Sequence, residues 1–286
     1  MSRISKKFEN LRSESKTVLI SYITAGDPSI SDSLSIMNTL VDSGTDIIEL
    51  GVPFSDPMAD GPTIQKACER ALKNNVSCSD IFNLVKNFRI KDDKTPVVLM
   101  GYLNPIERMG YDLFAKSASK AGVDAVLVVD LPHEEAEEVV AVFKSYNLES
   151  IFLVAPNTKV DRIKKISKYA SGFLYYVSLK GVTGAASLDI EKTSKQLKII
   201  KKEINLPLAV GFGIKDADTA KTLSKDADGI VIGSAIVNII EREQNNKIKV
   251  NNDIINLMRP IRLKLDDELT AGNRSWVGLK NSCPLE

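Results

Sequence analysis

The sequence predicts a single (β/α)8 (TIM) barrel, an α/β fold, and three observations carry this prediction. Eight short apolar runs, rich in β-branched residues, recur along the chain. Segments with helical periodicity separate these runs, and nothing between them resembles an interdomain linker. The length of 286 residues suits one large α/β barrel. In such a barrel the functional groups lie on the loops that follow the strands. An open doubly wound sheet is the structural alternative.

The eight apolar runs are typical of parallel strands buried on both faces, because they are continuous rather than alternating. They span Val18–Ile23, Ile47–Leu50, Val97–Tyr102, Ala125–Val129, Ile151–Ala155, Phe173–Val177, Leu208–Gly211 and Gly229–Ile232. The periodic segments predict helices over Asp32–Val41, Leu113–Ala121, Glu134–Phe143, Val160–Tyr169, Ile190–Ile204 and Ala217–Leu223. Further helices are expected within the loops that follow the strands.

A short repeat at 43–50, 121–128 and 226–232 supports the same architecture. In each copy a helix ends, usually at a glycine, an aspartate turns the chain, and a buried strand begins. The repeat indicates that one kind of helix-to-strand connection is used several times, as a barrel of repeated units requires.

The two ends of the chain lie outside the repeating pattern. Residues 1–16 are basic, as a cleaved presequence can be, but two glutamates interrupt them and Ile4, Phe8 and Leu11 share one helical face. We expect an amphipathic helix that covers the floor of the barrel. We expect 1–265 to form the single barrel domain, and 266–286 to be a C-terminal extension that is disordered or lightly docked.

Composition excludes several classes of function. The 38 Lys plus Arg and 37 Asp plus Glu leave a net charge of +1, so no basic field would attract nucleic acid or an anionic membrane. No apolar run reaches the ~18 residues that a membrane span needs. The three cysteines have no CxxC spacing, which argues against a disulfide framework or a zinc site and suits the cytoplasm.

The single histidine, His133, narrows the chemistry further. A site with several histidine ligands is impossible, and a Ser-His-Asp triad would depend wholly on this residue. His133 follows a proline and precedes two glutamates near the start of a predicted helix, so a solvated loop histidine is favoured over a catalytic one. The chemistry is therefore expected from carboxylates, hydroxyls, backbone amides or lysine.

One acid stands within an apolar run, at the C-terminal end of the second predicted strand. Glu49 is flanked by isoleucine and leucine. A charged group there is costly unless it has a partner or a function. Its position favours function over a satisfied structural carboxylate. Burial is expected to raise the pKa of Glu49, which suits a group that both gives and takes a proton.

A second acid follows in a loop restrained by prolines and glycines. Asp60 lies in the segment 51–62, immediately before Gly61 and Pro62. An aspartate in that place can cap the next helix, whose first turn would hold Pro62. The residues alone support capping and catalysis equally.

Three glycine-containing turns, at 178–184, 211–213 and 233–234, follow the sixth, seventh and eighth predicted strands. Glycine lets backbone N–H groups approach a phosphate, and a helix beginning after Ser234 would add its positive end. Tight strand-to-helix turns need glycine too, so each turn alone is weak support. Together, in the usual barrel position, they predict a phosphate site. The chain contains neither a GxGxxG fingerprint nor a GxxxxGK[ST] loop.

Seven segments of the chain resemble those of a known protein family. The segment ELGVPFSDPMADGP at 49–62 resembles the signature segment of tryptophan synthase α chains. Six further segments agree with the family in order along about residues 1–260, at 22–28, 100–105, 130–132, 181–184, 210–214 and 233–237. The 49–62 segment is highly specific, whereas the glycine motifs become specific only in its company.

The resemblance implies a lyase that splits indole-3-glycerol phosphate into indole and glyceraldehyde 3-phosphate, in the last stage of L-tryptophan biosynthesis. Glu49 would be the general acid/base, and Asp60 would hydrogen-bond the indole N–H. Tyr175 would line the site, and Thr183 would close its loop toward Asp60. The implied indole pocket consists of Tyr22, Met100, Leu127, Val129, Leu153 and Phe212. The implied phosphate ligands are Gly184, Gly213, Gly233 and Ser234.

The resemblance also implies a partner. The segment 54–57 and Asn104–Pro105 resemble the loops with which the family contacts a β chain in an α2β2 heterotetramer. Pyridoxal phosphate is then expected only in the β chain, with no cofactor and no metal in this one. A stand-alone lyase and a catalytically silent allosteric partner are the alternatives. The 49–62 segment argues against another phosphate-binding barrel of the same pathway.

The chain departs from the family pattern at two places. Tyr22 stands where the family is expected to have phenylalanine, which would add a hydroxyl to the indole pocket. Leu179 and Lys180 replace a pair that often includes arginine, so closure of the loop after the sixth strand would be tuned differently.

Overall fold

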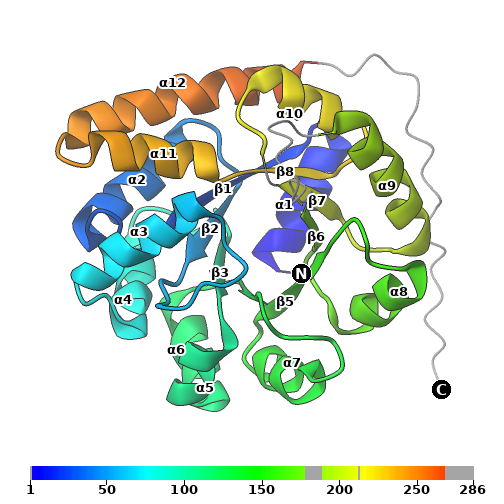
Figure 1. The fold of residues 1–286 in the computed structure, drawn as a ribbon, viewed down its shortest axis with the longest axis horizontal. Helices are drawn as coiled ribbons and strands as arrows, with labels where there is room; N and C mark the ends of the chain where they lie inside the picture. The colour runs from blue at the N-terminus through cyan, green and yellow to red at the C-terminus, as the bar shows by residue number, and fades with distance from the viewer. Residues whose placement is uncertain (1, 178–188, 212, 268–286) are drawn as a thin grey trace.

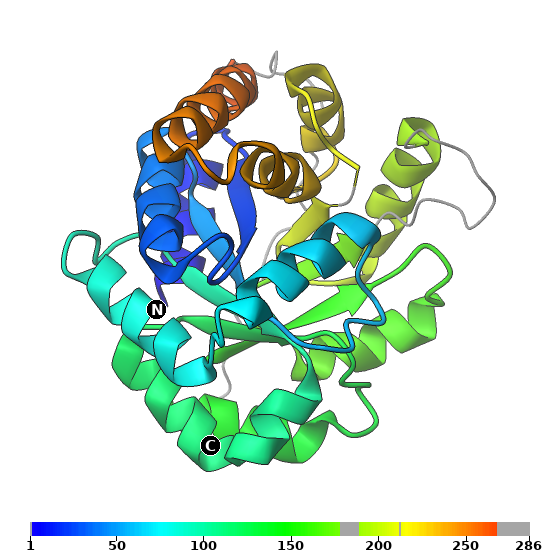
Figure 2. The ribbon, with the colours of Figure 1, turned by 60° about the vertical axis from the view of Figure 1, so that its left-hand side comes forward.

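The structure, a computed structural model, describes residues 2–177, 189–211 and 213–267. Eight parallel strands pair in chain order and close into a barrel. The closure is direct, since Val18 of the first strand is paired with Gly229 of the eighth. Figures 1 and 2 show helices surrounding the strands on all sides. The prediction of a (β/α)8 barrel is confirmed, and the open doubly wound sheet is excluded.

The strands agree with the predicted runs to within two residues at either end. They are β1 (Val18–Thr24), β2 (Ile47–Gly51), β3 (Val97–Gly101), β4 (Ala125–Val128), β5 (Glu149–Val154), β6 (Leu174–Val177), β7 (Leu208–Gly211) and β8 (Gly229–Ile232). All eight are buried along most of their length, because the barrel interior covers one face and the helices cover the other.

The predicted helices are present, and the expected additional helices lie in the loops after the strands. The first six helices are α1 (Arg3–Ser13), α2 (Ile30–Asp42), α3 (Pro62–Lys73), α4 (Cys78–Arg89), α5 (Leu103–Met109) and α6 (Tyr111–Ala121). The remaining six are α7 (Ala136–Ser145), α8 (Val160–Tyr169), α9 (Ile190–Glu203), α10 (Ala217–Ser224), α11 (Ser234–Glu243) and α12 (Lys247–Asp266). No helix among the described residues is long and apolar enough to cross a membrane.

Helix α1 covers the floor of the barrel, as predicted. Ile4 and Phe8 are buried in one cluster with inward-facing strand residues such as Ile20. The ring of Phe8 lies 5.6 Å from that of Phe173, immediately before β6. In Figure 1 the helix lies behind the strands, at the end opposite the viewer. The apolar face of α1 thus seals the N-terminal end of the barrel, which leaves the opposite end for a site.

Aspartates at the strand starts tie the floor together. Asp46, Asp124 and Asp228 each precede a strand and accept the N–H of the first or second residue of a neighbouring strand, at 2.8–2.9 Å. Each also pairs with a basic side chain of a helix; Arg89 and Asp124, for example, are 2.9 Å apart. The repeat detected in the sequence is therefore a structural device that fixes strand register at the floor.

Candidate active site

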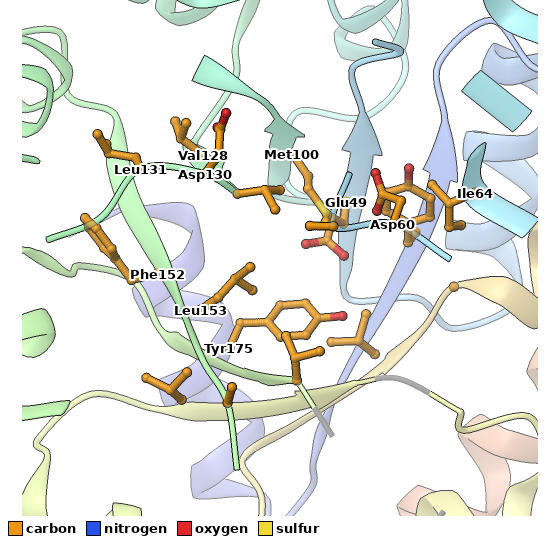
Figure 3. A pocket seen from close by; sticks show the side chains of 18 of the residues that line it. Glu49, Asp60, Ile64, Met100, Val128, Asp130, Leu131, Phe152, Leu153 and Tyr175 are labelled. Carbon is orange, nitrogen blue, oxygen red and sulfur yellow. The ribbon is translucent and has the colours of Figure 1, made fainter. Parts of the chain in front are cut away.

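A cavity of about 460 Å³ opens at the C-terminal ends of the strands. Its wall combines apolar side chains from the strand ends with Glu49 of β2 and Asp60 of the following loop. In Figure 3 the two carboxyl groups lie beside each other, and the ring of Tyr175 faces Glu49 from another strand. The volume falls in the range of small-molecule sites, about 300–1,000 Å³.

Glu49 is buried without a partner. It is only 1 % exposed, and neither carboxyl oxygen has a hydrogen bond to any residue that the structure describes. It is the one carboxyl group among the described residues with both oxygens buried and unbonded. Burial, followed by the negative charge of Asp60, raises the pKa of Glu49 to about 8. At neutral pH this carboxyl group holds a proton and can act as an acid.

Asp60 is held by a tyrosine and does not cap a helix. The N-cap of α3 is Gly61, and it has no side-chain cap bond. The hydroxyl of Tyr102 instead donates a hydrogen bond of 2.9 Å to Oδ2 of Asp60. Burial raises the pKa of Asp60, whereas this hydrogen bond lowers it. Of the two roles left open by the sequence, capping is excluded.

Two tyrosines pack across glycines of neighbouring strands. A Cβ atom at Gly51 would overlap the hydroxyl of Tyr22, and one at Gly211 would overlap the hydroxyl of Tyr175. The Tyr22 hydroxyl lies 3.2 Å from Oγ1 of Thr24, so its hydrogen bond is made within the protein. Burial raises the pKa of both hydroxyls well above the ordinary value, which keeps them neutral.

Most of the residues implied for the indole pocket come together. Tyr22, Met100, Val129 and Leu153 line the cavity with Tyr175. Leu127 does not line it: this side chain is 0 % exposed and packs in the barrel interior with Tyr175 above the floor helix. Leu127 therefore supports the cavity from beneath. Phe212, also named from the sequence, lies outside the described residues.

The glycine turns after β7 and β8 lie at the same cavity. Gly213, Gly233 and Ser234 line it, and α11 begins at Ser234. Gly233 is the N-cap of α11 and supplies no side chain to occupy the free N–H groups of the first turn. Thr183, Gly184, Leu179 and Lys180 lie outside the described residues.

The prediction of a solvated His133 is wrong. The residue does precede α7, but its side chain is only 7 % exposed and lines the cavity. Its Nδ1 atom is 2.8 Å from a carboxylate oxygen of Glu134, without the geometry of a hydrogen bond. Residues of the loops after β4 and β5 and of helix α8 line the same cavity. Their packing against one another could not be read from the polar residues around His133.

Sequence reasoning gave no role to Tyr102. It follows the last residue of β3, and its side chain is 3 % exposed. The position of a hydroxyl directly after a strand end was a usable signal, because that is where a barrel places functional groups. No group of three or more metal-ligating side chains was found in the part of the chain that the structure describes.

Comparison with known proteins identifies one family. The family model of the tryptophan synthase alpha chain matches residues 8–264. The tryptophan synthase alpha chain of Thioalkalivibrio sulfidiphilus is 56 % identical over 246 residues, 86 % of this chain and 92 % of its own. That of Marinobacter nauticus is 51 % identical over 266 residues, 93 % of this chain and 98 % of its own.

Solved structures give the same result. The tryptophan synthase alpha subunit of Legionella pneumophila superposes with a TM-score of 0.87 at 44 % identity, covering 93 % of this chain and 99 % of its own. A chain of the tryptophan synthase α2β2 complex of Pyrococcus furiosus superposes with a TM-score of 0.80 at 39 % identity, covering 86 % and 98 %. Because the family model covers most of the chain and these relatives are identical to it at more than half of the aligned residues, the chain belongs to the tryptophan synthase alpha chain family.

Proposed function

We propose that this family member, a lyase that cleaves indole-3-glycerol phosphate to indole and glyceraldehyde 3-phosphate, uses Glu49 as its acid and base and Asp60 as its charge stabiliser. The observation that carries the proposal is Glu49 itself, buried in the cavity wall without a hydrogen bond. Such a group is costly to the fold, and a reaction that needs a movable proton accounts for it.

Glu49 would act twice on the substrate. In its protonated form it donates a proton to C3 of the indole ring, which produces the indolenine tautomer. Its carboxylate then removes the proton of the C3′ hydroxyl. The C3–C3′ bond breaks, its electron pair returns to the ring, and the hydroxyl carbon becomes the aldehyde. The pKa near 8 supports both steps, because a group close to neutral can give and take a proton.

Asp60 would hydrogen-bond the indole N–H and stabilise the positive charge of the indolenine. Its place in the cavity wall and its hydrogen bond from Tyr102 support an ionised, oriented carboxylate. Tyr22, Met100, Val129, Leu153 and Tyr175 supply the mostly apolar wall that an indole ring needs. Leu127 would act from beneath, and Phe212 would complete the pocket.

The phosphate would be bound at the other side of the cavity. The amides of Gly213, Gly233 and Ser234, with that of Gly184, are the proposed ligands. The start of α11 at Ser234 supports this, since free N–H groups and the positive end of a helix attract anions. Thr183 would close its loop toward Asp60 once substrate is bound.

A tryptophan synthase beta chain is the partner, in an α2β2 heterotetramer. We propose that pyridoxal phosphate belongs to that chain and that the cleavage uses no cofactor of its own. The loop 53–60 presents an exposed Met58 beside the cavity, which gives a β chain a surface close to where indole is formed. The small number of cysteines, with Cys68 and Cys78 free in the described part of the chain, supports a cytoplasmic location.

We further propose that 1–265 is the whole catalytic domain and that 266–286 is dispensable for cleavage. Helix α12 extends one residue beyond this boundary, to Asp266, which pairs with Arg262 at 2.7 Å. A chain truncated after Asp267 is therefore the correct test, and it should retain full cleavage activity.

The deciding assay is indole release from indole-3-glycerol phosphate, with and without a beta chain. Release by the chain alone, accelerated by the partner, is the expected result. Equal rates in both conditions would favour a stand-alone lyase. No cleavage by the chain in either condition would favour a silent allosteric partner and would overturn the proposed chemistry.

A further inference from the structure

The hydroxyl of Tyr102 both accepts and donates a hydrogen bond. It accepts a hydrogen bond of 3.0 Å from the backbone N–H of Ala59 and lies 2.9 Å from Oδ2 of Asp60. A tyrosine hydroxyl has a single proton. The N–H of Ala59 can only donate, so it takes a lone pair of the hydroxyl and leaves its proton available for the hydrogen bond that Tyr102 donates to Asp60. This bond favours the ionised form of the carboxylate.

The tyrosine is itself rigidly placed. Tyr102 follows β3, and the next residue, Leu103, donates its N–H to Asp130 at 2.7 Å. The ring of Tyr102 lies 5.4 Å from that of Phe54, in the loop that carries Asp60. Tyr102 therefore connects the loop after β2 to the ends of β3 and β4. Its side chain does not line the cavity, so any effect on the reaction passes through Asp60.

The bond from Tyr102 occupies one of the two carboxyl oxygens of Asp60. Oδ2 is occupied by Tyr102, and the described residues donate no hydrogen bond to Oδ1. Asp60 is one of the residues that line the cavity. With no donor to Oδ1 among the described residues, this oxygen can accept a hydrogen bond from a ligand, in a direction that the Tyr102 bond determines.

We propose that Tyr102 is a positioning residue for the cleavage, which holds Asp60 ionised and directs its free oxygen toward the N–H of the indole ring. The inference rests on the proposed function, in which Asp60 receives that N–H. Tyr102 thereby also maintains the negative charge beside Glu49. The same hydroxyl would keep the two carboxyl groups in different protonation states, with Asp60 charged and Glu49 neutral.

The test is the pH profile of kcat/KM for Tyr102→Phe. In the wild type, activity should rise as Asp60 ionises and fall as Glu49 loses its proton near pH 8. Removing the hydroxyl raises the pKa of Asp60, so the acidic limb should move up by about one pH unit or more. The rate below that limb should fall about tenfold or more. The alkaline limb should not move, because Asp60 is ionised there in both proteins.

Tyr146→Phe is the matched control. Tyr146 also donates to an aspartate, Asp112, at 2.7 Å, but on the exposed outer surface. Its profile should superimpose on that of the wild type. In an Asp60→Asn background, Tyr102→Phe should no longer move the acidic limb.

An unmoved acidic limb in Tyr102→Phe, or the same loss of rate at every pH, would overturn the proposal. A wild type that releases no indole would overturn the proposed function instead. The ¹³C shift of the Asp60 carboxyl carbon then still decides the role of Tyr102. Titration of Asp60 at a higher pH in Tyr102→Phe supports that role, and an unchanged titration contradicts it.

Discussion

At the floor of the barrel Asp124 is surrounded by partners, whereas at the mouth Glu49 has none. The two oxygens of Asp124 lie 2.9 Å from Arg3 and Arg89, and one of them also accepts the N–H of Val97. Both acids are almost fully buried. Short parallel strands of one barrel are therefore associated with a paired acid at the floor, Asp124 before β4, and with an unpaired acid at the cavity, Glu49 within β2.

The difference shows how the barrel separates stability from reactivity. A buried carboxylate with N–H groups and a cation around it stays ionised and holds elements together. A buried carboxyl group without them takes up a proton and weakens the folded state whenever it is charged. Pairing of Glu49 by a cation would stabilise the fold, but it would remove the acid that the reaction needs.

The largest expected effect is on catalysis at the mouth. Glu49→Gln keeps the shape of the side chain but cannot transfer a proton, so single-turnover cleavage should fall at least ~10³-fold. Thermal stability at pH 7 should be unchanged or slightly higher, because no charge needs burial. Cleavage near the wild-type rate would show that Glu49 is only structural and that the mechanism is wrong.

Removal of the floor acid Asp124 should reduce stability and leave the cleavage rate unchanged, the opposite of the result expected for Glu49→Gln. Asp124→Ala leaves Arg3 and Arg89 without their shared partner, and it should cost about 3–5 kcal/mol of unfolding free energy. Cleavage per folded molecule should stay normal, because the floor is remote from the cavity. Asp112→Ala, on an exposed helix surface, is the control and should stay within about 0.5 kcal/mol of the wild type in urea denaturation. Equal losses of unfolding free energy in the two variants would show that the floor acid stabilises the fold no more than a surface acid does.

The unpaired Glu49 should make the stability of the fold depend on pH. Glu49 binds its proton more tightly in the folded chain, where its pKa is about 8, than in the unfolded chain, where the ordinary value is 4.5. The contribution of Glu49 to the free energy of unfolding is therefore fully present below pH 4.5 and is lost as the pH rises to 8. The melting temperature of Glu49→Gln relative to the wild type should increase across this window and level off above it. A constant difference from pH 4.5 to 8 would mean that Glu49 is not a protonated buried acid.

Asp60→Asn should have a milder effect on the rate than Glu49→Gln. The amide oxygen can still accept the indole N–H, but the negative charge that stabilises the indolenine is lost. We expect a loss of about ten- to a hundredfold in kcat, the size of one charge-assisted interaction. Single-turnover rates of both variants, measured together, check the ranking. A larger loss of rate in Asp60→Asn than in Glu49→Gln would indicate that Asp60, not Glu49, is the main proton-transfer group.

The fold and Glu49 were predictable because their signals are local. Eight continuous apolar runs define the strands, and an acid inside one of them is conspicuous. The role of Asp60 depends on Tyr102, which is 42 residues away in the chain, so no local pattern could decide it. His133 is buried in a cavity wall to which two loops and helix α8 also contribute, and such an assembly of distant segments has no local pattern. Leu127 was expected in the wall of the indole pocket but lies beneath the cavity, because the depth of the cavity is a matter of packing that no local pattern shows.

The smallest expected effect concerns the packing of Tyr22 against Gly51 in the cavity wall, where the contact is steric rather than an ion pair as at the floor. A Cβ at Gly51 would overlap the hydroxyl of Tyr22, so Gly51→Ala should destabilise the protein by about 1–3 kcal/mol. Tyr22→Phe removes that hydroxyl and its 3.2 Å bond to Thr24, which should cost about 0.5–1.5 kcal/mol. In the double variant the added methyl group meets less obstruction, so the two losses should be less than additive. Chemical denaturation of the four proteins measures this coupling. Strictly additive losses would show that the Tyr22 ring moves freely, and that Gly51 does not set its place in the cavity wall.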